Sequence, residues 1–143
     1  MQTVPIIFAR NNKIASFFIR LFTLSKWCHC AILDGDYVID TTLATGCRRI
    51  PFIEWKQHYH AYEIVDMPIA SQELGLRYAY SCIGCKYDWM GIISYILYKD
   101  YQSPDKQFCS ELVANYLGIE YKTWSLAPAT LYKTYKTLRG WIL

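Results

Sequence analysis

The stretch from residue 27 to residue 41 constrains the fold most, because its pattern is typical of two short strands joined by a tight turn. Residues 27–33 and 37–41 are two short runs typical of strands, and Asp34-Gly35 lies between them. Asp-Gly is a strong hairpin signal, since a type I′ turn requires positive φ at both central residues. We therefore predict an antiparallel β-hairpin with Asp34-Gly35 as its two-residue loop.

This loop fixes which residues face each other across the hairpin. It pairs Leu33 with Asp36 and places His29 opposite Asp40. Directly opposed residues share a face of the sheet, so the turn sets an imidazole beside a carboxylate. A four-residue loop over 33–36 gives the same register, whereas a three-residue loop puts Thr41 opposite His29 and turns Asp40 to the other face. The pair is either a surface contact or part of an active site.

A second informative stretch is an amphipathic helix that begins near Cys109. One helical face collects the residues at i, i+3, i+4, i+7 and i+8, namely Cys109, Leu112, Val113, Tyr116 and Leu117. Gly118 stands where a helix stop is expected, and Ser110, Glu111 and Asn115 make the other face. A helix that started at Ser103-Pro104 would hold Cys109 in its interior. We favour a separate turn there, which leaves Cys109 in the first turn of its helix.

Together these stretches supply the groups of a thiol nucleophile. A lone Cys on an apolar face most often packs as a small hydrophobe, but a nucleophilic thiol needs a base within hydrogen-bond reach and a third group that orients the base. Cys109, His29 and Asp40 can fill these roles as nucleophile, base and support. At a helix N-terminus the dipole favours the thiolate, and nearby N–H groups can hold an oxyanion.

The other cysteines and histidines favour simpler interpretations. Cys82 and Cys85 form a C-x-x-C, but no second C-x-x-C or histidine pair follows at zinc-finger spacing. This C-x-x-C closes a helix, whereas redox motifs normally open one. We therefore expect no metal and no cofactor. His58 and His60 lie in a polar stretch and are interpreted as surface residues.

The remaining periodicities predict an α+β domain with an antiparallel sheet packed against the Cys109 helix. Strands are predicted at 4–8 and 61–67, and 46–53 is interpreted as a loop leading to a strand. Helices are predicted at 13–24, at 71–82 with Leu74, Tyr78 and Cys82 on one stripe, at 89–97 after a cap at Asp88, and at 128–135. Residues 101–107 are interpreted as a loop.

Size and charge limit the function further. A chain of 143 residues suits one domain, here 1–143, and a net charge of +3 with no dense basic run gives no reason to expect nucleic acid. We find no secretory signal or membrane span, and expect a cytoplasmic location with free thiols. The 13–26 segment has basic residues around apolar ones. It is either a weak contact with a membrane surface or a short helix packed on the sheet, and we favour the helix.

Several motifs, in this order, resemble those of the circularly permuted NlpC-like, papain-like cysteine hydrolases. This group includes the YiiX-like proteins and is akin to the lecithin:retinol acyltransferase family. The matching motifs, over most of the chain, are Trp27-Cys28-His29, the hairpin with Asp40, Gly46, Pro51-Phe52-Ile53-Glu54-Trp55, Tyr87-Asp88-Trp89, Phe108-Cys109-Ser110-Glu111-Leu112-Val113 and Pro128-Ala129-Thr130-Leu131.

The resemblance implies a permuted papain-like fold, in which the His strand precedes the Cys helix. It implies a Cys109–His29–Asp40 triad, although the third position in relatives is often Glu or His. Motif positions Trp27, Tyr87 and Ser110 are then expected to contact substrate. The implied reaction is cleavage of an amide bond in a peptide, a cell-wall stem peptide or a protein conjugate. Lipid acyl transfer or thioester cleavage, and a catalytically silent binding module, are the alternatives. Small members without signals also suggest a phage origin, either host-cytoplasmic or virion-associated.

Overall fold

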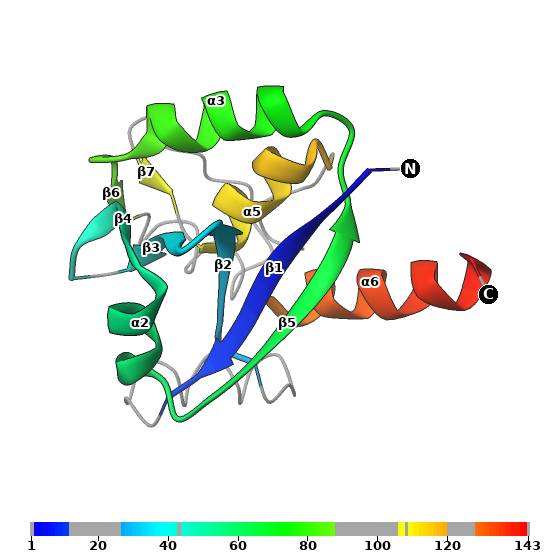
Figure 1. The fold of residues 1–143 in the computed structure, drawn as a ribbon, viewed down its shortest axis with the longest axis horizontal. Helices are drawn as coiled ribbons and strands as arrows, with labels where there is room; N and C mark the ends of the chain where they lie inside the picture. Colours follow the sequence, from blue (N-terminus) through cyan, green and yellow to red (C-terminus); the bar gives the residue numbers. More distant parts are fainter. Residues whose placement is uncertain are drawn as a thin grey trace, which may run out of the picture.

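A computed structural model describes residues 2–11, 27–42, 44–87, 106–107, 109–119 and 128–142 (Figure 1). The helices predicted at 13–24 and 89–97 lie outside these residues. In chain order the described elements are β1 (Thr3–Arg10), β2 (His29–Asp34), β3 (Tyr37–Thr42), β4 (Gly46–Pro51), α2 (Phe52–Trp55), the 3₁₀ turn η1 (Lys56–His58), β5 (Ala61–Pro68), α3 (Gln72–Cys82), β6 (Lys86–Tyr87), β7 (Lys106–Gln107), α5 (Cys109–Leu117) and α6 (Pro128–Ile142).

The centre of the fold is a five-stranded antiparallel sheet in the order β4-β3-β2-β1-β5. The predicted strands at 4–8 and 61–67 are confirmed as β1 and β5, which pair along their whole length. The segment 46–53 was predicted as a loop leading to a strand, and this prediction is wrong at its start. Residues 46–51 form strand β4, which pairs with β3. β6 and β7 form a separate short parallel pair. The α+β class predicted from the sequence is confirmed.

The predicted hairpin forms, but its register is wrong by two residues. The observed pairs are Asp34 with Tyr37, Leu33 with Val38 and Ile32 with Ile39. The two-residue loop is therefore Gly35-Asp36 and not Asp34-Gly35. Gly35 has φ = 59°, so the glycine occupies the first central position of the turn, where left-handed backbone is most readily supplied by glycine.

The shift leaves the important juxtaposition intact. Continued toward the start of β2, the observed register puts Ala31 opposite Asp40, and His29 becomes a diagonal neighbour of Asp40. Because strand side chains alternate with a period of two, a slip of two residues keeps His29 and Asp40 on one face. Diagonal neighbours are still within reach of long or aromatic side chains.

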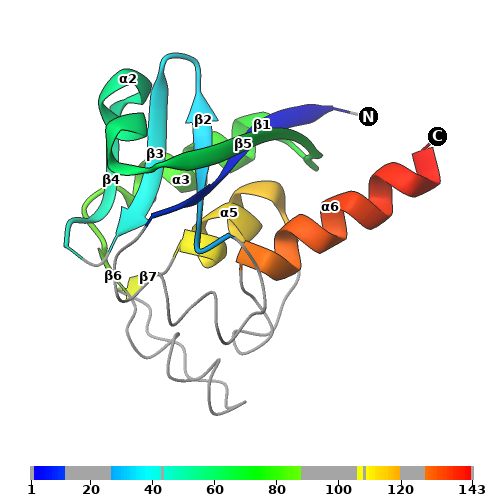
Figure 2. The same ribbon diagram turned by 90° about the horizontal axis from the view of Figure 1, so that it is seen from below.

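Helices cover both faces of the sheet, and the strands alternate to match. One face packs against α3, α5 and α6 and includes Ile6, Phe8, Cys30, Ile32 and Ile39. The other face is smaller and packs against the ring of Trp55 from α2, with Ile7, Ala9, Ala31 and Val38 buried beneath it. His29 and Asp40 belong to this second face. Figures 1 and 2 show α5 alongside α3 and next to β2.

Helix α5 begins at Cys109, as predicted, and its expected apolar face is buried. Gly118 has φ = 76° directly after the helix, consistent with the predicted stop. The polar face of α5 is not a solvent-exposed face, because its residues Ser110 and Glu111 are also buried. The sequence shows an amphipathic helix, whereas the structure surrounds its first turns with protein.

Helix α3 is confirmed, with the Ser71 hydroxyl accepting a hydrogen bond from the backbone N–H of Leu74 at its N-terminus. The predicted apolar stripe is wrong for Leu74, which is 64% exposed. The buried side of the helix instead carries Gly75, Ala79 and Cys82. A small face is required there because α3 lies directly on α5.

The predicted final helix at 128–135 is confirmed and is longer, since α6 runs to Ile142. Its first turns pack on the sheet through Leu131 and through Tyr132, whose ring lies edge-on to Phe8 at 5.2 Å. Within the described residues, no helix has the length and apolar character needed to cross a bilayer.

Candidate active site

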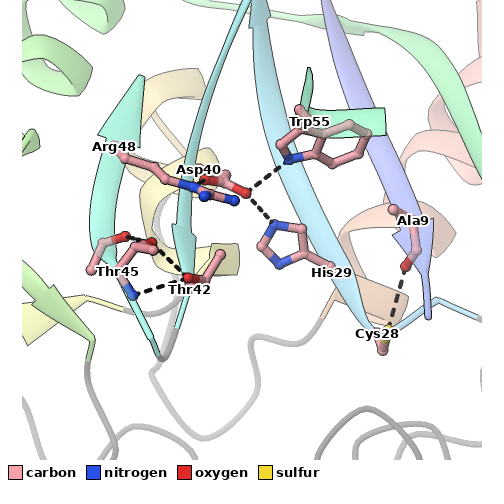
Figure 3. Close-up of polar contacts among 9 residues, drawn as sticks. Ala9, Cys28, His29, Asp40, Thr42, Thr45, Arg48 and Trp55 are labelled. Atoms are coloured by element: carbon pink, nitrogen blue, oxygen red, sulfur yellow. Dashed lines mark hydrogen bonds and ion pairs between the residues drawn. The ribbon is translucent and has the colours of Figure 1, made fainter. Parts of the chain in front are cut away.

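Three elements bring the predicted triad residues together. His29 is the first residue of β2, Asp40 lies in β3, and Cys109 is the first residue of α5. His29 Nε2 lies 3.0 Å from Asp40 Oδ2, in a contact that is almost fully buried (Figure 3). The sequence predicted this pair, and the structure forms it from diagonal rather than directly opposed positions.

The thiol of Cys109 is hydrogen-bonded to the His29 side chain. Since Asp40 occupies Nε2, the ring nitrogen left for the sulfur is Nδ1. The imidazole thus bridges a thiol and a carboxylate, with one ring nitrogen for each. Cys109 and His29 are 4% and 8% exposed, so the site is closely enclosed but still reaches the surface at these two residues.

Asp40 receives hydrogen bonds from two further donors. Arg48 Nε lies 2.9 Å from Oδ1, and the indole Nε1 of Trp55 lies 2.8 Å from Oδ2, as Figure 3 shows. Burial alone would raise the pKa of Asp40, but hydrogen bonds and charge interactions with His29 and Arg48 lower it to about 2. Asp40 is therefore a carboxylate across the physiological range.

Aromatic rings stack on the imidazole of His29. The ring of Tyr59 stacks on His29 at 5.3 Å with an interplanar angle of 7°, and Trp55 stacks on Tyr59 at 4.3 Å. Burial raises the pKa of Tyr59 to about 12, so its hydroxyl stays neutral. The stacked rings restrict the imidazole to the plane in which both of its nitrogens are used.

The electrostatics favour an ion pair between sulfur and imidazole. Burial lowers the pKa of His29, yet the hydrogen bonds to Asp40 and Cys109 and the negative charge of Cys109 raise it well above its ordinary value. The pKa of Cys109 falls well below its ordinary value, because hydrogen bonds from Cys30 and His29 and the charge of His29 outweigh burial. Opposite shifts of this kind are typical of a thiol and an imidazole that form an ion pair, as they do in thiol active sites.

Cys30 is a second thiol in direct contact with Cys109. The Cys30 side chain and backbone both hydrogen-bond to the Cys109 sulfur. Burial and these contacts raise the pKa of Cys30 well above its ordinary value. The thiol group of Cys30 therefore acts as a donor to the Cys109 thiolate. The sequence predicted that Cys30 points to the layer opposite His29, and that orientation is what places it against α5.

The three expected substrate contacts lie in different environments. Trp27 is 4% exposed and packs near the ring of Tyr132, at 5.8 Å. Ser110 follows Cys109 and is fully buried in α5. Tyr87 belongs to β6, and its side chain lies outside the described residues. Their roles as substrate contacts stay predictions.

Four residues of this site were not assigned a role from the sequence: Cys30, Arg48, Trp55 and Tyr59. Arg48 pairs directly with Asp40 between β3 and β4. This cross-strand pair can be predicted only if residues 46–51 are taken as a strand, and not as part of a loop. Trp55 comes from α2 and Tyr59 from the loop after η1, and neither is placed by strand periodicity. His58 and His60 are exposed, as predicted.

No metal centre is formed by the residues that the structure describes, since no group of three or more His, Cys, Asp or Glu side chains is arranged to hold an ion. Cys47, Cys82 and Cys85 lie near one another but are free thiols.

Comparison with known proteins identifies a structural relative. No family model matches the chain, and no curated protein matches it. Among solved structures, the metalloprotein YiiX (DUF1105) from Escherichia coli O157:H7 matches with a TM-score of 0.63 and 25% sequence identity, over 92% of this chain and 79% of that chain. The chain therefore has a YiiX-like α+β fold.

Proposed function

We propose that the protein is a cysteine hydrolase that cleaves an amide bond, in a peptide or a protein conjugate, through an acyl-thioenzyme. The observation that carries this proposal is the continuous hydrogen-bonded series from Cys109 to His29 to Asp40. The motif resemblance to permuted NlpC-like, papain-like hydrolases supports it, and the YiiX-like fold agrees with that resemblance.

The first half-reaction uses the ion pair directly. The Cys109 thiolate attacks the carbonyl carbon, so that a C–S bond forms and the carbonyl oxygen becomes an oxyanion. The intermediate collapses by breaking the C–N bond, and the imidazolium of His29 gives its Nδ1 proton to the leaving amine. Asp40 holds Nε2 throughout and stabilises the charged ring.

The second half-reaction reverses these roles. Water attacks the thioester while His29 takes its proton, the C–S bond breaks, and the acid leaves with Cys109 again a thiolate beside imidazolium. Cys109 begins α5, and the first N–H groups of a helix have no intrahelical acceptor. They are suitable donors for the oxyanion formed at that position.

YiiX is described as a metalloprotein, so we tested whether a metal fits this chain. Both oxygens of Asp40 already accept hydrogen bonds from cationic or N–H donors, and the described residues offer no group of three suitable ligands. These residues do not fit a metal site.

The proposal is tested by trapping the acyl-thioenzyme. The protein is incubated separately with cell-wall stem peptides, ubiquitin-like conjugates and acyl esters, and the mass of the Cys109 peptide is measured after acid quenching. We expect an acyl adduct on Cys109 from an amide donor, which Cys109→Ala abolishes. An adduct only from acyl esters would replace the amide proposal with lipid acyl transfer or thioester cleavage.

Thiol reactivity distinguishes an enzyme from a silent binding module. At mildly acidic pH iodoacetamide should alkylate Cys109 before the other cysteines, since the pKa of Cys109 is lowered, whereas burial raises the pKa of Cys30 and of Cys47. His29→Ala should slow this alkylation at pH 6 by at least about tenfold, because each pH unit of rise in the thiol pKa removes about nine-tenths of the thiolate. Equal labelling of all six thiols would contradict the proposed chemistry.

A further inference from the structure

Cys30 in β2 and Cys109 at the start of α5 form a pair of thiols that the hydrolase reaction does not require. An acyl-thioenzyme mechanism uses one sulfur, that of Cys109, and needs no second thiol at hydrogen-bond distance. Cys30 nevertheless contacts Cys109 through both its side chain and its backbone, from the strand that also carries His29. Both residues belong to the same buried cluster.

The pair is asymmetric in access and in ionisation. Cys109 is 4% exposed and is the thiolate, whereas Cys30 is completely buried and keeps its proton. A small oxidant from solvent therefore meets Cys109 first. Low-pKa, accessible thiols beside a second Cys are those that oxidise reversibly.

We propose that Cys109 and Cys30 form a reversible oxidation site, in which peroxide oxidises Cys109 and Cys30 resolves the product as a disulfide. The site protects the nucleophile from irreversible oxidation and switches it off while the disulfide persists. It depends on the two thiols alone and does not rest on the identity of any hydrolase substrate.

The chemistry balances with hydrogen peroxide as the oxidant. The Cys109 thiolate attacks one peroxide oxygen, the O–O bond breaks, and hydroxide leaves, giving a sulfenic acid. The Cys30 sulfur then attacks the Cys109 sulfur, so that the S–S bond forms and the S–O bond breaks, and the Cys30 proton leaves with the hydroxyl as water. Once Cys109 is a sulfenic acid, it no longer carries the negative charge that raises the pKa of Cys30, so the Cys30 thiol loses its proton more readily.

The neighbouring Cys28 offers a matched control. It lies two residues from Cys30 and is also buried, but its sulfur is directed to the carbonyl oxygen of Ala9 at 3.6 Å, as Figure 3 shows. It has the same redox chemistry without the contact to Cys109. Trypsin places Cys28 and Cys30 on one peptide, residues 27–48, together with Cys47, and places Cys109 on residues 107–122.

The test is to oxidise the full chain with hydrogen peroxide, block free thiols, digest without reductant and measure peptide masses. We expect a disulfide-linked pair of peptides 27–48 and 107–122 in the wild type and in Cys28→Ala. Dithiothreitol should remove the link and restore iodoacetamide labelling of Cys109. In Cys30→Ala the link should be lost and Cys109 should advance to sulfinic acid, which dithiothreitol does not reverse.

The outcomes separate this proposal from the hydrolase proposal. Sulfinic acid on wild-type Cys109 with no linked peptide, or a link that persists in Cys30→Ala, would overturn the oxidation site. Circular dichroism checks that Cys30→Ala folds, and Cys30→Ser serves as a second variant, with the wild-type measurement decisive if both misfold. A chain that forms the link but traps no acyl group keeps the oxidation site and loses the hydrolase.

Discussion

At the scale of single residues, the candidate site is organised around the Asp40 carboxylate. A fully buried anion is costly unless each oxygen is hydrogen-bonded. Asp40 meets this condition with donors from three elements, since His29 comes from β2, Arg48 from β4 and Trp55 from α2. The donors compensate the burial, so that the carboxylate can orient His29 and keep the imidazole charged beside Cys109.

Asp40→Asn tests this support. The neutral amide cannot stabilise the imidazolium, so the pKa of His29 should fall, and the midpoint of its NMR titration should move to lower pH. Loss of one partner from a buried charged pair should also reduce the free energy of unfolding by about 3–5 kcal/mol. The exposed Asp66→Asn is the control, and should leave the His29 titration in place. An unmoved His29 midpoint in Asp40→Asn would refute the assigned role.

Trp55→Phe tests the third donor. The substitution keeps an aromatic ring near Tyr59 but removes the N–H that lies 2.8 Å from Asp40. Hydrogen bonds to charged groups contribute about 1.5–3 kcal/mol, so a double-mutant cycle of Trp55→Phe with Asp40→Asn, read by urea unfolding, should give a coupling of that order. Additivity within about 0.3 kcal/mol would show that the indole does not support the carboxylate.

At the scale of secondary-structure elements, the close approach of α3 to α5 fixes the position of the helix that carries Cys109. A Cβ placed on Gly75 would stand 2.5 Å from the backbone oxygen of Tyr116 and 2.9 Å from its ring. Glycine is therefore needed for packing at this position, and its φ is not in the left-handed region. The contact positions α5 from one side while β2 positions it from the other.

Gly75→Ala should consequently destabilise the fold, although alanine is the better helix former. Overpacking costs about 1–3 kcal/mol, against a helix-propensity gain of about 0.5–1 kcal/mol, so a net loss is expected in urea unfolding. Leu74→Ala on the same helix is the control, because Leu74 is largely exposed and its truncation should change stability by less than about 0.5 kcal/mol. A more stable Gly75→Ala would mean that the helices separate at no cost.

At the scale of the whole molecule, the sheet carries two unequal cores and the site lies where they meet. The Cys109 thiol comes from the larger core, with α3, α5 and α6, whereas His29 and Asp40 belong to the smaller core under Trp55. Helix α6 closes the larger core with Leu131, and Tyr132 ties it to β5 by a hydrogen bond from its hydroxyl to Glu63 at 2.9 Å.

Leu131→Ala is expected to reduce the free energy of unfolding by about 2–5 kcal/mol, since it leaves a cavity beneath α6. Because α6 packs on the sheet that bears the site, thermal unfolding should remain a single transition at a lower Tm. Lys133→Ala, an exposed change two residues away on α6, should leave the Tm within a degree or two. A Leu131→Ala protein with unchanged Tm would show that α6 is not part of the core.

The sequence alone determined most of the described elements, the shared face of the β2–β3 hairpin and the buried face of α5. Apolar patterns with a period of two or 3.6 residues predicted strands β1, β2, β3 and β5 and helices α3 and α5, the last of which begins at Cys109. The predicted contact between His29 and Asp40 is correct although the predicted turn is wrong, because a register shift of two residues leaves each side chain on the same face of the sheet. Local rules were sufficient wherever the interacting residues lie within one hairpin or one helix.

Only the tertiary structure decided how Cys109 meets its partners. The contacts to His29 and Cys30 join α5 to a strand some eighty residues earlier in the chain, and Arg48, Trp55 and Tyr59 reach the site from separate elements. No periodicity encodes such distances, because they follow from helix packing on the sheet and from the side on which each helix docks. The same packing chose which face of α3 is buried.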